Sequence, residues 1–276
     1  MKVLVTGANG YLGQGIVKEL LNHGVSVIAN DKECNYVDAR AEIKLGDLFE
    51  ISNPYEFFDK PDVVLHLAWR DGFQHDSFNH IKYLPKHYSF LNSLSKAGVR
   101  RICVLGSMHE IGFYEGSIDE NTPTNPLSLY GIAKNTLRQA MEVETKKDGT
   151  LLQWVRGFYI VGNAEHGCSV FSKIAQTAKS GGKEFPFTTG QNQFDFIDYD
   201  QFCMQVAAVV LQEDILGIIN CCSGHPVKLA ERVETFIAEN HYDIKLLYGK
   251  FPDRPYDSKA IWGNDSKIKK IMEKYV

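Results

Sequence analysis

The sequence has few of the features that mark secreted, membrane-bound or metal-dependent proteins. Its six cysteines (34, 103, 168, 203, 221 and 222) show no CxxC spacing, and its nine histidines form no HExxH pair. We therefore expect reduced cysteines in the core and no metal site. No apolar run approaches the length of a membrane span. Only the short run Val3-Leu4-Val5 precedes Thr6, too little for a signal peptide, so we expect a cytoplasmic protein.

The chain also lacks a large excess of charge of either sign. It carries 30 basic and 34 acidic residues in 276, a net charge of −4. This balance gives no basic face for nucleic acid, so any phosphate binding must be local. The length suits one large α/β domain, or a large domain with a small one. We expect a soluble enzyme with a small-molecule substrate and neither a nucleic acid nor a membrane as partner.

The most informative segment that is present is TGANGYLG, residues 6–13. It follows an apolar run and opens an amphipathic stretch, residues 11–21. A strand, a glycine turn and a helix N-terminus in this order form a site for the pyrophosphate of a dinucleotide. Gly7 allows the tight turn, Gly10 lets the phosphates approach the backbone, and Gly13 lets the helix pack close to the sheet. The unpaired N–H groups of the first helical turn, which starts at Tyr11 and Leu12, then face the anion.

An acidic residue completes the cofactor motif. The run 25–29 predicts a second strand, which ends at Asn30-Asp31. An acidic side chain about 20 residues past the glycines can accept hydrogen bonds from the adenosine ribose. Its charge would repel a 2′-phosphate, so Asp31 favours NAD over NADP, whereas Lys32 beside it argues the other way. The alternative is an ordinary acidic residue in a βα loop.

Strand and helix patterns alternate along the chain, which predicts an α/β fold with a Rossmann-type doubly wound parallel sheet. Further strands are expected at 42–47, 62–68, 101–106, 151–156 and 217–222. Helices are expected within 76–97 and at 129–147, 168–180, 201–211 and 227–239. The pattern loosens near residue 162. We therefore expect an NAD-binding domain with the catalytic residues at 1–162, and a mainly substrate-binding lobe at 163–276 whose segments can interleave with it.

The catalytic motif is YxxxK on the helix predicted at 129–147. Tyr130 and Lys134 are four residues apart and share a helix face. A lysine there lowers the pKa of the phenol and orients the cofactor ribose, so the tyrosine can exchange a proton with an alcohol or carbonyl oxygen. The motif alone is common, and a surface lysine beside a packed tyrosine is the alternative. Ser107, at the end of the fifth strand, favours catalysis because its hydroxyl would hold the same substrate oxygen.

Together these motifs resemble the extended short-chain dehydrogenase/reductase family, mostly nucleotide-sugar epimerases, dehydratases and ketoreductases. The resemblance runs nearly end to end and includes TGxxGxxG, the ribose-binding Asp31 and the catalytic pair Tyr130 and Lys134. It implies that Asp47, in the element Gly46-Asp47-Leu48, contacts adenine. It also implies that Leu67 and Ala68, in an HxA segment, line the nicotinamide side.

The same resemblance extends to later segments. Residues 156–162, 193–197 and 220–224 are similar to the family's RxxNxxG, Q-R-D-F-I/V and N-x-x-S-G stretches, and Arg254 to an arginine that grips the nucleotide diphosphate. It implies a homodimer in which the helix at 129–147 and the helix before the fifth strand pair across a two-fold axis. The first of these helices is rich in apolar residues (Ile132, Leu137, Ala140, Met141 and Val143).

Several residues of the expected substrate site depart from the family. Phe194 stands where many members have Arg, and Tyr159 where many have Asn, while Leu84-Pro85 lies near a usual buried Asn. Trp69, in the loop after the fourth strand, could stack on the nicotinamide or the sugar, or pack on the core. We expect Trp69, Tyr159, Phe194 and Arg254 to bind substrate. His75, His80 and His87 are expected at the surface.

His109 is a further candidate. The dehydratase branch carries Thr-Asp-Glu where this chain has Ser107-Met108-His109, so 4,6-dehydration is not expected. The segment is more similar to the strand of GDP-fucose synthase, which has a base two residues past the serine. Residues two apart on a strand share a face, and imidazole titrates near neutrality, so His109 could be a second acid or base. The alternative is a partly buried histidine bonded to a loop carbonyl.

The resemblance implies NAD(H)-dependent hydride transfer at C4 of a nucleotide-activated sugar. Net reduction of a 4-keto sugar, often 6-deoxy, is favoured because the short chain resembles the compact ketoreductases. A 4-epimerase with tightly bound NAD is the alternative. A non-catalytic NAD-sensing regulator is less consistent with the intact set of Ser107, Tyr130 and Lys134.

Overall fold

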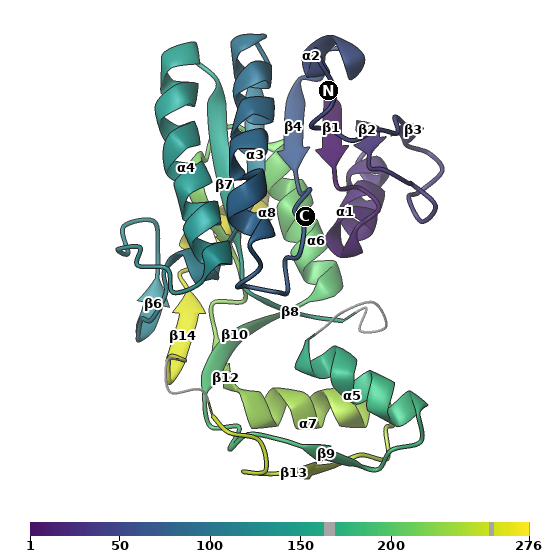
Figure 1. Cartoon of the computed structure of the whole chain (residues 1–276), viewed down its shortest axis with the longest axis vertical. Helices are drawn as coiled ribbons and strands as arrows, with labels where there is room; N and C mark the ends of the chain where they lie inside the picture. The colour runs from purple at the N-terminus through teal and green to yellow at the C-terminus, as the bar shows by residue number, and fades with distance from the viewer. Residues whose placement is uncertain (163–168, 254–256, 276) are drawn as a thin grey trace.

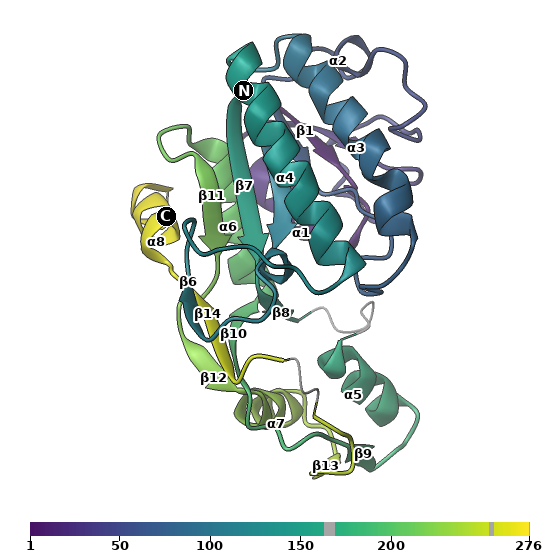
Figure 2. The ribbon, with the colours of Figure 1, turned by 60° about the vertical axis from the view of Figure 1, so that its left-hand side comes forward.

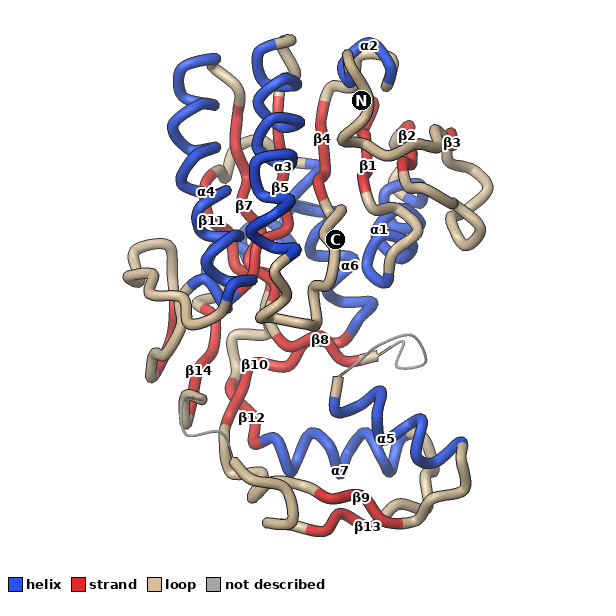
Figure 3. The backbone as a smooth tube through the Cα atoms, viewed as in Figure 1, coloured by secondary structure: helices blue, strands red, loops and turns tan. Residues whose placement is uncertain are grey.

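The computed structural model describes residues 1–162, 169–253 and 257–275. These residues form a large α/β unit with helices on both faces of a sheet, and a smaller lobe beyond the carboxyl ends of its strands (Figure 1). The loop 67–78 lies at these ends, between the large unit and the lobe (Figure 3).

The large sheet has seven parallel strands in the order β11-β7-β5-β4-β1-β2-β3. Their bounds are β1 (Lys2–Thr6), β2 (Ser26–Asn30), β3 (Glu42–Ile43), β4 (Val63–His66), β5 (Arg101–Ser107), β7 (Leu151–Gly157) and β11 (Gly217–Cys221). The order reverses between β1 and β4, and ligands bind at such a switch point in doubly wound sheets. The predicted Rossmann-type fold class is therefore confirmed.

Helices cover both faces of this sheet (Figures 1 and 2). One face carries α1 (Tyr11–Asn22), α6 (Tyr199–Leu211) and α8 (Ser266–Tyr275); the other carries α3 (Asn79–Lys96) and α4 (Leu129–Asp148), with α2 (Pro54–Phe57) at its edge. The strands are mostly apolar because both faces are buried, although polar side chains such as His66 and Arg156 are buried among them. In β1, Val3 and Val5 pack in the cluster under α1, and Leu4 packs in the cluster under α3.

The smaller lobe is built mostly from short strands. One sheet has the order β12-β10-β14-β6, with β8 also paired to β10, and β13 pairs with β9. The bounds are β6 (Gly116–Ile118), β8 (Tyr159–Val161), β9 (Glu184–Pro186), β10 (Gln193–Asp198), β12 (Pro226–Lys228), β13 (Lys245–Leu247) and β14 (Ala260–Gly263), with α5 (Val170–Lys179) and α7 (Leu229–Glu239). Aromatic residues such as Phe171, Phe196 and Phe236 fill its core.

Several predicted elements differ from the structure at their ends; the strand expected at 62–68, for example, spans only Val63–His66. Two of the differences have a clear local cause. The strand expected at 42–47 ends at Ile43, because the chain turns at Gly46 (φ +155°), whose N–H bonds to the carbonyl of Asp31. The helix expected from Val227 begins at Leu229, because Pro226–Lys228 pairs with β10 as β12.

The predicted core cysteines are confirmed at four positions. Cys103, Cys203, Cys221 and Cys222 are buried free thiols, whereas Cys34 is a half-buried one. Cys168 lies outside the described residues. Among the helices that the structure describes, none combines the length and apolar character needed to cross a bilayer.

Candidate active site

A continuous cleft of about 1540 Å³ runs from the glycine turn after β1 to the smaller lobe. Nearly all the predicted cofactor-binding, catalytic and substrate-binding residues line this cleft: Gly7, Gly10, Tyr11, Leu12, Gly13, Asp31, Asp47, Leu48, Leu67, Ala68, Trp69, Ser107, His109, Tyr130, Lys134, Tyr159 and Phe194. Arg254 lies outside the described residues. Cofactor-type and catalytic residues therefore share one space.

The glycine turn leaves no room for side chains. Gly7 has φ +71°, and a Cβ there would lie 2.7 Å from the backbone nitrogen of Ala68. A Cβ on Gly13 would lie 2.3 Å from the carbonyl oxygen of Gly7. Gly10 precedes α1 in extended backbone, and no side chain caps the helix there. The first-turn N–H groups are thus left for an anion, and the turn fits a dinucleotide pyrophosphate.

Asp31 follows β2 at the edge of this turn. Its carboxylate accepts hydrogen bonds from the N–H of Asn9 (3.1 Å) and of Lys32 (2.8 Å). The Lys32 ammonium pairs with Asp47 at 2.8 Å, and this contact holds the pKa of Asp47 below its usual value. The positive charge beside Asp31 is therefore already partnered by a carboxylate.

Packing of α4 on the end of β5 brings Ser107 and Tyr130 together. Ser128 caps α4 by accepting a bond from the Gly131 N–H (3.2 Å). A Cβ on Gly131 would lie 2.4 Å from the carbonyl oxygen of His109, so the helix start sits directly on the turn after β5. Burial raises the pKa of the Tyr130 phenol, and a hydrogen bond with Ser107 opposes that shift.

Lys134 lies one turn further along α4 and is 1% exposed. Its Nζ donates to the carbonyl of Leu105 at 2.6 Å and lies 3.8 Å from the centroid of the Trp69 ring. Burial lowers the pKa of Lys134 to about 7, and the charge of Glu110 acts in the opposite direction. Lys134 is therefore a buried amine close to its charge transition at neutral pH.

The strand geometry expected to carry His109 does not persist. β5 ends at Ser107, and Met108–Glu110 form a 3₁₀ turn, η1, in which Ser107 Oγ accepts from the His109 N–H at 3.2 Å. The same-face argument was therefore wrong. The His109 ring nevertheless reaches the cleft, with its centroid 6.2 Å from that of Tyr130 and 6.4 Å from that of Tyr159.

The surface location expected for His80 and His87 was wrong, since both are buried in α3. Trp69 Nε1 donates to His80 Nδ1 at 3.0 Å, and the His87 ring stacks on Trp69 at 4.3 Å. His75 is half-buried and stacks on Tyr130 at 5.2 Å. Helical periodicity could have predicted their burial. His80 and His87 are seven residues apart and lie on the same face of α3 as the buried Leu91 and Leu94.

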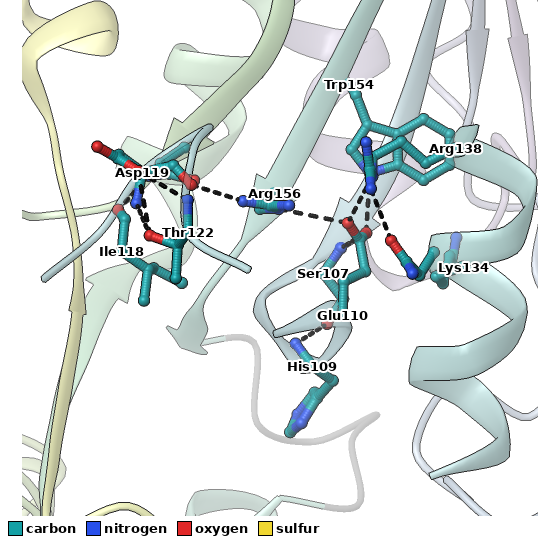
Figure 4. Close-up of polar contacts among 12 residues, drawn as sticks. Ser107, His109, Glu110, Ile118, Asp119, Thr122, Lys134, Arg138, Trp154 and Arg156 are labelled. Carbon is teal, nitrogen blue, oxygen red and sulfur yellow. Dashed lines mark hydrogen bonds and ion pairs between the residues drawn. The ribbon is translucent and has the colours of Figure 1, made fainter. Parts of the chain in front are cut away.

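Glu110 is a buried residue that sequence reasoning missed (Figure 4). Its Oε1 accepts from the Ser107 N–H and from Trp154 Nε1, each at 2.8 Å. Its Oε2 lies 3.3 Å from Arg156 Nε and 3.8 Å from Arg138 Nε. Ser107 and Glu110 form a capping box, and the S-x-x-E spacing was the signal that could have found it.

The wall of the cleft in the smaller lobe is aromatic. Tyr159 and Phe194 lie ring to ring at 4.5 Å, and Phe196 lies 5.7 Å from Tyr159. The buried Asp195 between these phenylalanines faces away from the cleft's chemistry. It accepts bonds from the N–H groups of Ser223, Gly224 and Gly263 at 2.8–3.0 Å, which ties β10 to the turn after β11 and to the end of β14.

The family model described as "NAD dependent epimerase/dehydratase family" matches residues 3–222. The chain belongs to this family. It is 41% identical to the dTDP-6-deoxy-L-talose 4-dehydrogenase (NAD(+)) of Aggregatibacter actinomycetemcomitans, over 95% of this chain and 99% of that protein. It is 24% identical to a UDP-glucose 4-epimerase of Lactobacillus helveticus, over 99% of this chain and 91% of that one.

Solved structures of low sequence identity share the fold. A UDP-glucuronic acid 4-epimerase from Bacillus cereus, in complex with UDP-glucuronic acid and NAD, aligns with a TM-score of 0.83 at 19% identity. The alignment covers all of this chain and 94% of the other. The UDP-glucose 4-epimerase of Thermotoga maritima aligns with a TM-score of 0.83 at 18% identity, over 98% and 92% of the two chains.

Replacing Glu110 should cost much of the stability of the fold. Glu110→Gln leaves the buried Arg156 guanidinium without its charge partner, so we expect the free energy of unfolding to fall by about 3–5 kcal/mol. The control Glu142→Gln removes a partly exposed ion pair with Arg138 and should cost less than about 1 kcal/mol. Denaturant titration measures both. Equal losses in the two variants would contradict the role given to Glu110.

Proposed function

We propose that the protein is an NAD-dependent oxidoreductase acting at C4 of a nucleotide-activated sugar, most simply one that interconverts a nucleotide 4-keto-6-deoxysugar and its 4-hydroxy form. The observation that carries the proposal is the placing of Ser107, Tyr130 and Lys134 in the same cleft as the glycine turn. The 41% identity to a 4-dehydrogenase of a dTDP-6-deoxysugar over nearly the full length supports the substrate class.

The cofactor half of the cleft fits NAD(H), which supplies or accepts the hydride when bound. Gly7, Gly10 and Gly13 would shape the turn, and the first-turn amides of Tyr11 and Leu12, which no side chain caps, would hold the pyrophosphate. Asp31 would accept bonds from the ribose. Asp47 and Leu48 would contact adenine, and Leu67 and Ala68 would line the nicotinamide side, as the family resemblance implies.

In the catalytic half, Tyr130 gives a proton to the C4 oxygen on reduction and takes it back on oxidation. Ser107 donates a hydrogen bond to the same oxygen. Burial raises the pKa of the phenol and the Ser107 hydrogen bond opposes it; a charged Lys134 would act in the same direction as Ser107. Trp69, Tyr159, Phe194 and Arg254 remain the predicted substrate contacts, with His109 as a residue that orients the sugar.

A 4-epimerase is the second candidate, because the solved structures that share the fold include UDP-sugar 4-epimerases. An epimerase keeps its NAD through the reaction, whereas a dehydrogenase exchanges it each turnover. Purified protein that releases stoichiometric NAD on denaturation would favour the epimerase. An empty site with turnover of added NADH would favour the oxidoreductase.

Loss of the phenol hydroxyl should abolish most turnover. We expect Tyr130→Phe to lower kcat by at least about a hundredfold, the scale of a lost general acid or base, with cofactor binding nearly unchanged. Tyr242→Phe, a phenol in the smaller lobe outside the cleft lining, is the control. The assay follows NADH absorbance with a dTDP-4-keto-6-deoxysugar. Wild-type turnover by Tyr130→Phe would refute the mechanism.

Asp31 should set the cofactor preference. We expect kcat/KM to be higher with NADH than with NADPH, because the carboxylate repels a 2′-phosphate. Asp31→Ala should lower the ratio of kcat/KM with NADH to kcat/KM with NADPH by roughly tenfold, which corresponds to about 1.4 kcal/mol. Asp38→Ala, an aspartate paired with Arg40, serves as the control. If wild-type enzyme prefers NADPH, the ribose-binding role of Asp31 is wrong.

We further propose a cytoplasmic homodimer. The four buried free thiols suit a reducing compartment. On α4, Ile132 and Val143 are 40% and 54% exposed, and Ile81 on neighbouring α3 is 36% exposed, so apolar side chains remain uncovered on this face. These exposed residues support pairing of α3 and α4 with a second copy.

Light scattering at micromolar concentration should give the mass of a dimer. Val143→Glu should shift the protein to monomer because it places a charge in the apolar contact. Met204→Lys, on α6 at the opposite face of the sheet, should leave the dimer intact. A monomeric wild-type protein would overturn this proposal.

A further inference from the structure

We infer that Trp69 is a positioning residue for the catalytic machinery: its indole ring, held by two buried histidines, keeps the Lys134 ammonium charged and in place beside Tyr130. The inference rests on the proposed function, since it concerns the Lys134 of the catalytic set. It gives Trp69 a role apart from substrate contact.

The contact between Lys134 and Trp69 is close. Lys134 Nζ lies 3.8 Å from the ring centroid, well inside the distance of about 6 Å at which an aromatic face attracts a cation. The side chain is almost completely buried, so protein groups must replace the water that would stabilise the charge. The carbonyl of Leu105 supplies one such contact at 2.6 Å, and the indole face supplies a second.

Trp69 is itself held at its edge. The indole N–H donates to His80 Nδ1 at 3.0 Å, and His80 Nε2 lies 2.9 Å from the carbonyl oxygen of Gln74. Since the indole can only donate and the carbonyl can only accept, Nδ1 of His80 accepts from Trp69 and its Nε2 donates to Gln74. These two hydrogen bonds each have one possible direction, and together they fix the plane of the Trp69 ring.

A second histidine supports the ring itself. The His87 imidazole stacks on Trp69 with centroids 4.3 Å apart and planes 17° from parallel. His87 Nδ1 lies 2.9 Å from His66 Nε2, and His66 Nδ1 lies 2.8 Å from Thr6 Oγ1. Thr6 is the last residue of β1, so this chain links the glycine turn to the support of Lys134.

These histidines remain uncharged beside the lysine. Burial, together with the positive charge of Lys134, lowers the pKa of His66 to about 3 and places the pKa of His87 well below its usual value. A protonated imidazole stacked on Trp69 would repel the ammonium. Because His66 and His87 carry no positive charge, the Trp69 ring contacts the Lys134 ammonium without a competing cation beside it.

The charged and titratable groups that face Lys134 are Tyr130 from α4, Glu110 from η1, His66 from β4 and His87 from α3. Among these four groups, Glu110 is the one whose charge raises the pKa of Lys134, and its carboxylate is also bound to Arg156. A lysine with a pKa of about 7 is sensitive to any further loss of stabilisation. Removing the indole should therefore lower the pKa of Lys134 and its charge at neutral pH.

The test measures the pKa of Lys134 directly, by NMR titration of protein labelled with [ε-¹³C]lysine, with Lys134→Arg to assign the signal. Trp69→Leu should lower this pKa by roughly one unit, the size of a buried cation–π contact. The charged fraction at pH 7 would then fall about fivefold, and kcat with it. Trp69→Phe keeps an aromatic face without the N–H donor and should show less than half of the shift.

Site-specific incorporation of mono-, di- and trifluorotryptophan at position 69 gives a second measurement. Fluorine withdraws electron density from the ring face and keeps its shape, so the pKa of Lys134 should fall stepwise with fluorine content. This series answers the question even where Trp69→Leu fails to fold.

An unchanged Lys134 pKa in folded Trp69→Leu, or in the fluorinated series, would overturn the inference. So would a Trp69→Phe shift as large as that of Trp69→Leu, since the N–H bond to His80 would then be the part that matters. Full turnover by Tyr130→Phe would instead refute the proposed function, and it would leave the measured pKa of Lys134 untouched. The two failures are therefore distinguishable.

Discussion

The buried carboxylate of Glu110 is the interaction on which the geometry of the active site depends. It binds the backbone N–H of Ser107, the indole of Trp154 on β7 and the guanidinium of Arg156 on the same strand (Figure 4). A carboxylate without exposure must have its lone pairs satisfied, and here groups from β5 and β7 do so, while Arg138 on α4 adds a positive charge at 3.8 Å. The turn that carries Ser107 is therefore fixed from inside the sheet.

Close backbone contacts impose a second constraint. Gly7 meets Ala68, and Gly131 meets the carbonyl of His109, at distances that admit no Cβ. The first contact brings the cofactor turn against the end of β4, and the second brings Tyr130 to Ser107. Both sets of functional groups are thus placed by packing that only glycine permits. The close backbone packing at Gly7 and Gly131 therefore both stabilises these turns and sets the shape of the cleft.

The glycine turn and the catalytic pair could be predicted because their signals are local. Gly7 and Gly13 are required by a turn of a few residues, and Tyr130 and Lys134 by one helical turn. Local patterns mark Glu110 as part of a helix cap and His87 as part of a buried helix face, but they do not reveal the partners Arg156 and His66, which lie far away in the sequence. The sheet of the smaller lobe could not be predicted for the same reason. This sheet pairs residues 116–118 with 261–263, and three-residue strands show no usable period.

Burial shifts the pKa values of two groups near Trp69 in opposite directions: it raises the pKa of Tyr130 and lowers the pKa of Lys134. Desolvation pushes Tyr130 and Lys134 toward their neutral forms, and each is needed in its charged form at some stage of proton transfer. Burial lowers the pKa values of His66 and His87 below their usual range, so these two rings add aromatic contacts without adding positive charge beside Lys134. The buried ammonium of Lys134 thus lies beside Tyr130 without a like charge on His66 or His87. The histidines of α3 make that arrangement compatible with a packed core.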